Sequence, residues 1–330
     1  MFLSELGKLL ISGDLWGPGL QFGALLLLPA LGGVISERSG VVNVAMEGMM
    51  LTGAFFGAIV VVDTHSVLLA VLVAMLTGGM MALVHAFFAI QFKADQIVSG
   101  IAINIAALGL TGFLLPIFTN GEGVATLHAP LTLPNLDLAF LDHSAGVLGF
   151  INEVFLQQNV IFYISIAVLL GMQYLLFHTN IGLRIRSVGE HPQAADTAGI
   201  NVRLIRYLCV ITSGLLSGLA GAFLALGVAH IFNPNMTEGR GFIALAAMIF
   251  GKWKPWNTAL ACLIFGLGTE LQYQFPLLPT TGIGIIDTPL HSTPLLAMIP
   301  YVLTILVLVG LIGRAVAPAA DGLPYEPGGE

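Results

Sequence analysis

The feature that most constrains this chain is a series of long apolar runs, each close to the length of a membrane-spanning helix. Such a helix needs about 20 predominantly apolar residues. Only 9% of the 330 residues are charged, whereas soluble proteins have about 25%. We therefore predict an integral membrane protein of the all-α, polytopic class with about eight full spans. The expected spans are 19–35, 41–62, 66–90, 97–118, 159–177, 205–227, 256–273 and 293–313.

One further apolar run, 242–251, is too short to cross a bilayer and predicts a re-entrant or half-helix. Such a segment is tolerated only where protein buries it or where it lines a cavity. Its surroundings resemble residues 36–58, because both stretches have a polar, glycine-containing start followed by small apolar residues. The shared Gly-x(4)-Ala spacing, Gly40 to Ala45 and Gly241 to Ala246, is a weak indication of an internal inverted repeat, an arrangement that can build a pathway through a membrane.

Lysine and arginine indicate which side of the membrane each loop occupies. If the loop 183–203 is cytoplasmic, alternation of the spans places nine of the eleven basic residues on that side. The connection 119–158 then lies outside and contains acidic residues but no basic one. We expect the N-terminus outside and the C-terminus in the cytoplasm. The basic residues on the cytoplasmic side are Arg38, Lys93, Arg184, Arg186, Arg203, Arg206, Lys252, Lys254 and Arg314.

Three regions follow from this pattern. Residues 1–18, with Lys8 and Trp16, are expected to form an interfacial segment before the first span. Residues 19–313 form a single transmembrane domain. Residues 314–330 are rich in proline and glycine, a composition typical of disordered segments, and predict a flexible cytoplasmic tail.

The loop between Arg184 and Arg206 contains a short helix signal. Pro192 suits the first helical position because it lacks an N–H group, and Gly199 can take the left-handed conformation at the C-terminus. A short helix of small residues between two spans has two interpretations. It is either a solvated connector or a projection that docks into another protein at the cytoplasmic surface.

Polar residues within or beside the spans are the candidates for a substrate pathway. Asn43 and Glu47 are four residues apart, so a helix would place them on one face, although several glycines nearby also favour an unwound segment. An ionisable group at membrane depth usually faces a cavity or the bundle interior; the alternative is a carboxyl hydrogen-bonded to a neighbouring helix. Asn104 is either a contact between helices or a ligand contact. Arg240 is either a snorkelling side chain or functional, and Glu270 is expected near an interface.

Motifs for catalysis are absent from the sequence. It contains no G-x(4)-G-K-[ST] motif for ATP binding, no H-E-x-x-H and no G-x-S-x-G. The eight histidines are scattered without metal-binding spacing, and both cysteines lie in apolar runs. We therefore expect no catalytic residue, no metal, no cofactor in this chain and no nucleic-acid partner.

Three blocks of sequence, at 37–57, 185–202 and 237–256, resemble the inner-membrane permease subunits of ABC importers. The resemblance is to the family that serves branched-chain amino acids, ribose and other simple sugars, and nucleosides. The motifs ERSGVVN…EG and GRGFIALAAMIFGKW are most similar to the nucleoside-type permeases. The blocks have the expected order and spacing, and the resemblance covers nearly the whole chain.

The resemblance implies that the 185–202 loop is the coupling segment that inserts into the ATPase subunit, where ATP and Mg²⁺ are bound. It also implies a second, different permease subunit and an extracytoplasmic binding protein, which the acidic connection 119–158 could help to dock. We place Asn43, Glu47, Asn104, Arg240 and Glu270 along the substrate path. The residues expected to couple to the ATPase are Arg184, Arg186, Gly189, Glu190, Pro192, Ala194, Ala195, Asp196 and Gly199.

This interpretation gives a permease without its own ATPase site. Its pathway opens to one side of the membrane and then to the other, so that substrate passes from the binding protein to the cytoplasm. Sugars and branched-chain amino acids remain alternative cargoes. An ion-coupled secondary transporter, with Glu47 as the proton carrier, is the main rival mechanism. A membrane enzyme would need a catalytic cluster that the sequence lacks.

Overall fold

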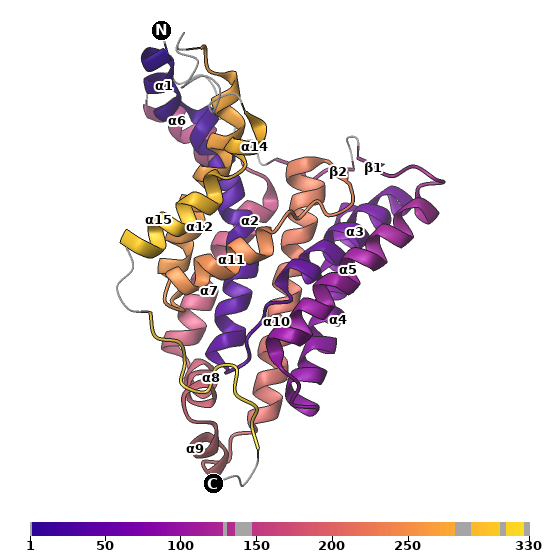
Figure 1. Ribbon diagram of the computed structural model, residues 1–330, viewed down its shortest axis with the longest axis vertical. Helices are drawn as coiled ribbons and strands as arrows, with labels where there is room; N and C mark the ends of the chain where they lie inside the picture. Colours follow the sequence, from indigo (N-terminus) through magenta and orange to yellow (C-terminus); the bar gives the residue numbers. More distant parts are fainter. Residues whose placement is uncertain (1, 128–130, 136–146, 281–291, 311–314, 327–330) are drawn as a thin grey trace.

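The computed structural model describes residues 2–127, 131–135, 147–280, 292–310 and 315–326. Within these residues the regular structure is helical except for one short antiparallel pair, β1 (Ala125–Thr126) with β2 (Ile231–Phe232) (Figure 1). The α-helices are α1 Phe2–Leu10, α2 Gly13–Arg38, α3 Met46–Thr64, α4 Val67–Ala86, α5 Gln96–Phe118, α6 Val147–Ile151, α7 Val160–His178, α8 Asn180–Glu190, α9 Pro192–Thr197, α10 Val202–Ala222, α11 Arg240–Phe250, α12 Pro255–Gln274, α14 Thr293–Leu296 and α15 Ile299–Gly310. Three π-helical turns, Phe87–Gln91, Asn152–Leu156 and Phe223–Ala229, and one 3₁₀ turn, Phe275–Leu277, extend them.

Six helical segments in the described chain are long and apolar enough to cross a membrane, so the expected count of eight is not confirmed. α12 is 20 residues long but is too polar to be one of these spanning segments, since its last turns carry Glu270 and three further polar side chains. The predicted span 293–313 consists of two separate helices, α14 and α15, as far as residue 310. The six segments are Gly13–Arg38, Met46–Thr64, Val67–Gln91, Gln96–Phe118, Val160–His178 and Val202–Ala229.

The first two predicted spans have different limits in the structure. α2 begins at Gly13, because the chain turns between α1 and α2 well before residue 19; the expected interfacial segment is therefore divided between two helices. The predicted span 41–62 is not one helix either. Residues 39–45 are not helical, and α3 begins only at Met46. Asn43 and Glu47 consequently do not share a helical face.

α10 lies at the centre of the bundle and contacts α2, α3 and α4. Glycines allow this close packing: a Cβ atom on Gly218 would collide with the Ala74 carbonyl of α4, and one on Gly221 with the Met50 carbonyl of α3. Close approach of backbones through small residues is typical of helix packing in lipid. α4 and α5 have mostly exposed apolar surfaces, which indicates that they lie at the edge of the bundle.

α11, the short helix predicted at 242–251, contains 11 residues and is too short to span a bilayer. It crosses α2 and contacts α12 and α3 (Figure 1). The proposed sequence repeat has no matching local structure, since Gly40 lies in a turn whereas Gly241 lies within α11.

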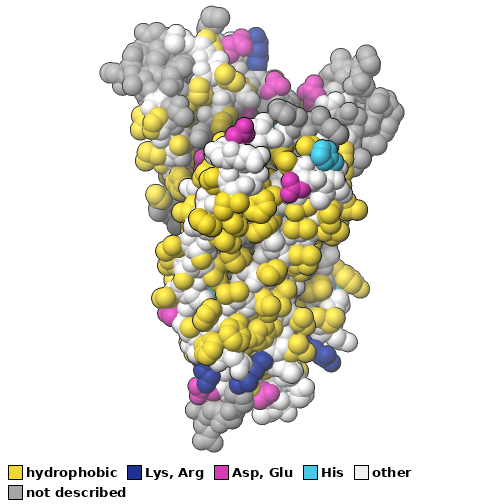
Figure 2. Space-filling model, turned by 90° about the vertical axis from the view of Figure 1, so that its right-hand side faces the viewer, with side chains coloured by type: hydrophobic (Ala, Val, Ile, Leu, Met, Phe, Trp, Pro, Cys, Tyr) yellow, Lys and Arg dark blue, Asp and Glu magenta, His cyan; other side chains and the backbone are white. Residues whose placement is uncertain are grey.

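Basic side chains gather at the end of the molecule that carries α8 and α9. Arg38 donates from Nε to the Trp253 carbonyl (3.0 Å), and the guanidinium groups of Arg38 and Arg186 both lie over the Phe177 ring. Figure 2 shows an apolar surface along the middle of the molecule, with most of the visible Lys and Arg side chains near one end. We call this the basic end. α1, α6 and α14 lie at the opposite end.

The C-terminal tail differs from the flexible segment predicted from composition. Residues 315–326 pack against the basic end, where the Ala320 amide donates to the Gly189 carbonyl (2.9 Å). Tyr325 is only 7% exposed. Long-range contacts therefore order a segment whose proline and glycine content is typical of disorder. Arg314 and residues 327–330 lie outside the described part of the chain.

Candidate functional site

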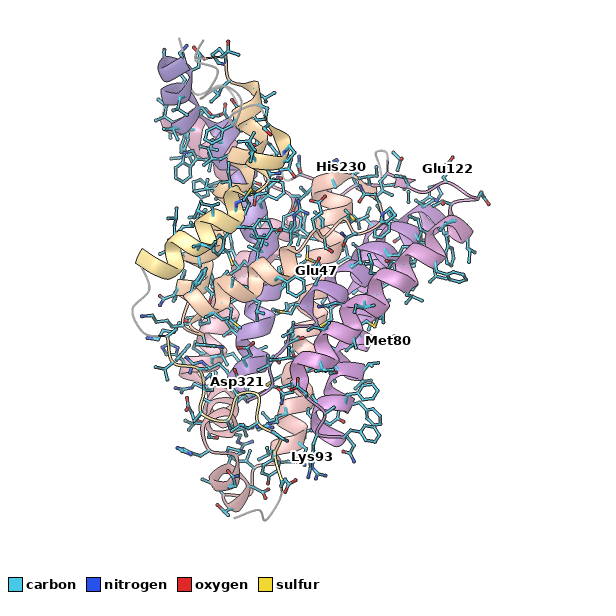
Figure 3. All side chains as sticks on the ribbon, in the orientation of Figure 1. Glu47, Met80, Lys93, Glu122, His230 and Asp321 are labelled. Atoms are coloured by element: carbon cyan, nitrogen blue, oxygen red, sulfur yellow. The ribbon has the colours of Figure 1, made fainter. Side chains whose placement is uncertain are left out.

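The N-termini of α3 and α11 meet near the middle of the molecule through one carboxylate, that of Glu47 (Figure 3). Glu47 Oε1 accepts a hydrogen bond from the Gly239 amide (2.9 Å), and Oε2 accepts one from the Gly241 amide (2.6 Å). These amides belong to the first turn of α11, whose N–H groups have no partner within the helix. A carboxylate is also favoured there by the helix dipole. Glu47 thus caps α11 from the first turn of α3.

Gly241 is required by this close approach. A Cβ atom at position 241 would lie 2.6 Å from the Cα of Glu47 and 2.8 Å from its Oε2 atom. No side chain larger than hydrogen fits at that distance without movement of the backbone. The capping carboxylate and the glycine therefore form one unit, which we call the α3–α11 junction.

The non-helical segment before α3 has its backbone satisfied by side chains from other helices. The Val42 amide donates to Gln96 Oε1 of α5 (2.7 Å), and His85 Nε2 of α4 lies 3.0 Å from the Val42 carbonyl oxygen. His85 Nδ1 also lies 3.1 Å from Ser99 Oγ. Polar groups buried at membrane depth need such partners because no water is available. No role for these residues was recognisable from the sequence, since their spacing matches no motif.

Asn43 and Asn104 complete this arrangement. Asn43 Nδ2 donates to Ser213 Oγ of α10 (2.8 Å). Asn104 accepts from the Gly48 amide (2.8 Å) and donates to the Val44 carbonyl (3.0 Å). The structure therefore brings three of the predicted path residues together around the start of α3. In this conformation their polar atoms bind protein, and their contact with a substrate stays a prediction.

The other two predicted path residues, Arg240 and Glu270, line a cleft of about 480 Å³. A volume of 300–1,000 Å³ is typical of small-molecule sites. The cleft lies between the start of α2, the turn after α10 and the end of α12. Its lining consists of Pro18, Gln21, Phe22, Leu224, Val228, Ala229, Ile231, Asn233, Met236, Glu238, Arg240, Glu270 and Tyr273.

Charged and aromatic groups are both present in the cleft. Arg240 Nη1 donates to the Met236 carbonyl (2.9 Å) and lies 3.3 Å from Glu238 Oε2. Glu270 Oε1 accepts from Gln274 Nε2 (2.7 Å). The rings of Phe22 and Tyr273 stack with their centroids 5.8 Å apart. Hydrogen-bonding groups beside a flat aromatic surface are suited to a polar molecule with a planar ring.

The cleft and the junction share the turn 238–241. Glu238 and Arg240 line the cleft. The amides of Gly239 and Gly241, in the same turn, donate to the Glu47 carboxylate. A change in the position of α3 would therefore reach the cleft lining through a single turn. Within the described residues, no group of three or more His, Cys, Asp or Glu side chains is arranged to hold a metal ion.

Sequence reasoning missed most of the cleft lining. Gln21 is a polar residue in the first apolar run and could have been found for that reason. Tyr273 and Asn233 lie at the ends of apolar runs, where polar and aromatic residues are common. Nothing local distinguishes them, because the cleft is formed by segments far apart in sequence.

The predicted coupling segment consists of α8 and α9. Pro192 occupies the start of α9, and Gly199 takes a positive φ of 82°, as predicted. Arg184, Glu190, Ala194, Asp196 and Gly199 are exposed, whereas Gly189, Pro192 and Ala195 are buried and Arg186 is half-buried. The predicted set therefore has two parts, an exposed one available to a partner and a buried one that supports it.

The family model for the branched-chain amino acid transport system / permease component matches residues 18–308. The chain belongs to this family. The match includes the α3–α11 junction, the cleft and the segment α8–α9.

Individual relatives agree with this membership over most of the chain. The guanosine ABC transporter permease protein NupQ of Bacillus subtilis is 42% identical, covering 94% of this chain and 95% of NupQ. The nucleoside ABC transporter permease protein NupC of Lactococcus lactis is 39% identical, covering 93% and 94%. A putative glucose ABC transporter permease protein of Haloferax volcanii is 34% identical, covering 88% of each chain. No solved structure matches significantly.

Proposed function

We propose that this chain is the membrane permease subunit of an ABC importer that carries nucleosides into the cell. The observation that carries the proposal is the 42% identity to a guanosine permease along 94% of this chain, together with 39% identity to a nucleoside permease. The cleft supports it, since the exposed Tyr273 ring, backed by the buried Phe22 ring, lies with Arg240 and Glu270 in the lining and so combines an aromatic surface with hydrogen-bonding groups for an uncharged nucleoside.

In this proposal the basic end faces the cytoplasm, as the positive-inside rule requires, and the cleft opens toward an extracytoplasmic binding protein. A partner ATPase binds ATP and Mg²⁺ and docks on α9. Closure of the ATPase dimer moves α8 and α9, and the bundle switches the side to which the pathway opens. Binding in the pathway is weak, because a tightly held substrate would not be released.

A second, different permease is proposed to complete the pathway. Bacillus subtilis has two proteins named guanosine ABC transporter permeases: NupQ, at 42% identity to this chain, and NupP, at 26% over 299 residues. This chain is therefore proposed to take the NupQ-like position beside a more distant homologue. The exposed apolar faces of α4 and α5 are available for lipid or for that subunit.

A sugar is the second candidate cargo, because the Haloferax relative is named as a putative glucose permease. A branched-chain amino acid is a third, since the family description names that class. An ion-coupled transporter remains the mechanistic rival. In the structure Glu47 is committed to two backbone amides, which favours a structural carboxylate over a proton carrier.

The test is uptake of radiolabelled guanosine, adenosine, cytidine, glucose and leucine in cells that lack this gene, its ATPase or neither. We expect nucleoside uptake to fall in both deletions and to return when the missing gene is supplied. If glucose or leucine uptake falls and nucleoside uptake is unchanged, the assignment of nucleosides as cargo is wrong, but the assignment to the ABC importers stands. Uptake that needs this chain but not the ATPase contradicts the ABC mechanism.

A further inference from the structure

The C-terminal tail is attached to the predicted coupling segment by hydrogen bonds. The Ala320 amide donates to the Gly189 carbonyl at the end of α8 (2.9 Å). The Ala319 amide donates to Glu190 Oε2 (3.2 Å). The tail therefore lies directly beside the start of α9.

Arg206 holds the tail from the other side. Its guanidinium donates from Nη1 to the Leu323 carbonyl (2.9 Å) and from Nε to the Ser39 carbonyl (3.2 Å). Arg206 is 2% exposed, so this contact is shielded from water. Lys93 forms an ion pair with Glu326 further along the tail. The backbone of residues 319–326 is consequently fixed at several points.

The end of the tail packs against α9 itself. Tyr325 forms a small apolar cluster with Val188, Ala195 and Val202. Between this cluster and the start of α10 lies a hollow of about 370 Å³, which we call the tail socket. The tail socket is lined by Asp196, Gly199, Ile200, Asn201, Val202, Arg203 and Tyr325.

The side chain of Leu323, in the part of the tail that these contacts fix, is largely uncovered. Leu323 is 56% exposed, although its carbonyl is held by Arg206. It lies at the basic end, outside the helices that could span the membrane. Because the backbone of Leu323 is already fixed, covering this side chain with a partner would cost little further conformational entropy.

We propose that residues 321–326 and α9 together form one docking surface for the ATPase subunit, with Leu323 and the tail socket as its anchor points. The proposal rests on the proposed function and adds to it a contact outside the helix that the family resemblance assigns to coupling. The exposed residues Ala194 and Ala198 of the α9 segment continue the surface, since small side chains allow a partner to approach. Asp196 and Arg203 in the tail socket give it groups of both charges for a polar side chain of the partner.

The test is thiol labelling of Leu323→Cys in nanodiscs that contain both permease subunits, with and without the purified ATPase subunit of the same transporter. Native background is low, because Cys209 and Cys262 are 3% and 1% exposed. Val316→Cys is the matched control. Val316 is an exposed apolar residue of the same tail (73%) that lies outside the proposed surface, residues 321–326.

We expect the ATPase subunit to slow labelling of Leu323→Cys severalfold and to leave Val316→Cys unchanged. Unchanged labelling at position 323, or equal protection at both positions, overturns the composite surface. In either case co-purification of the wild-type permease with the ATPase subunit shows separately whether the importer assignment stands. If the wild-type complex does not form, it is the proposed function that fails.

A functional readout avoids dependence on the label. Leu323→Asp places a charge on the exposed side chain without touching the Arg206 hydrogen bond to the backbone, and Val316→Asp is its control. We expect Leu323→Asp to lower ATPase-coupled nucleoside uptake severalfold at unchanged expression, with Val316→Asp near wild type. Wild-type uptake by Leu323→Asp contradicts the proposal.

Discussion

The carboxylate of Glu47 and the amide of Gly241 form a 2.6 Å hydrogen bond that joins the first turn of α3 to the first turn of α11. The two residues are 194 positions apart in the chain. Neither helix start could be buried alone, because the N–H groups of α11 and the carboxylate of Glu47 would each lack a partner. In the junction the α11 amides and the Glu47 carboxylate are each other's hydrogen-bond partners. The same contacts join α3 to α11, which are far apart in the sequence.

We predict that Glu47→Gln weakens this junction. A glutamine can accept only through its one oxygen, and its NH₂ group would face an amide that also donates. Hydrogen bonds to charged groups contribute about 1.5–3 kcal/mol, and we expect a loss of stability of that size together with reduced uptake. Thermal unfolding in detergent measures the first effect. The exposed Glu122→Gln is the control, and equal midpoints for the two variants would contradict the capping role.

Gly241→Ala tests the close approach independently of charge. The added Cβ atom would lie 2.6 Å from the Glu47 Cα atom, so the backbone must move, and overpacking of this kind costs about 1–3 kcal/mol. Gly109→Ala in α5 is the matched control, since a Cβ atom there meets nothing within 4 Å. We expect the thermal midpoint to fall only for Gly241→Ala. Equal effects of the two alanines would rule out a specific requirement for glycine at the junction.

The sequence predicted the long apolar helices well, because their length and composition are local properties. It did not predict where α3 begins. The segment 39–45 is unwound because Gln96, His85, Asn104 and Ser213 from three other helices bond to it, and none of these pairings can be read from spacing.

The same limit explains the other differences. The tail 315–326 has a disorder-like composition, yet the buried Arg206 and the cluster around Tyr325 hold it in place. The cleft combines residues from α2, the turn after α10 and α12, so only Arg240 and Glu270 were found among its lining. By contrast, α9 was predicted closely, since proline at its start and glycine after its end are local signals.

Docking of the tail is expected to depend on pH. Burial raises the pKa of Asp321 to about 7, although its hydrogen bond with Glu37 and the charge of Arg206 act in the opposite direction. In an unfolded chain the pKa of aspartate is about 3.9. The packed state therefore binds the proton more tightly, so the stabilisation is complete below about pH 4 and is lost as the pH rises through about 7.

Thermal unfolding between pH 5.5 and pH 8.5 measures this dependence. The difference in pKa sets an upper limit of about 4 kcal/mol, and we expect the midpoint to fall as the pH rises across this range. Asp321→Asn removes one carboxyl of the Asp321–Glu37 pair and should make the profile less steep, whereas Asp63→Asn, at an exposed position, should not. A midpoint that rises with pH in the wild type, or a profile unaffected by Asp321→Asn, would show that Asp321 does not control packing of the tail.

Neighbouring alanines in α9 separate docking from folding. Ala194 is exposed, whereas Ala195 is buried against the Tyr325 cluster. Ala194→Trp should leave thermal stability unchanged and uncouple ATP hydrolysis from uptake. Ala195→Trp should lower stability by about 1–3 kcal/mol through overpacking. Reconstituted vesicles give both readouts, and normal coupling in Ala194→Trp would remove α9 from the docking surface.

The orientation of the bundle can be tested by thiol labelling from each side of the membrane. Ala198, after α9, and Asn135, in the connection between α5 and α7, are both exposed, and the buried native cysteines Cys209 and Cys262 contribute little background. Ala195, at 4% exposure, would report packing and not sidedness. We expect an impermeant maleimide to label Asn135→Cys in intact cells and Ala198→Cys only in inverted vesicles, because the positive-inside rule places the basic end in the cytoplasm. The reverse pattern would place α9 outside, where no ATPase could reach it. It would contradict both the predicted topology and the proposed ABC mechanism.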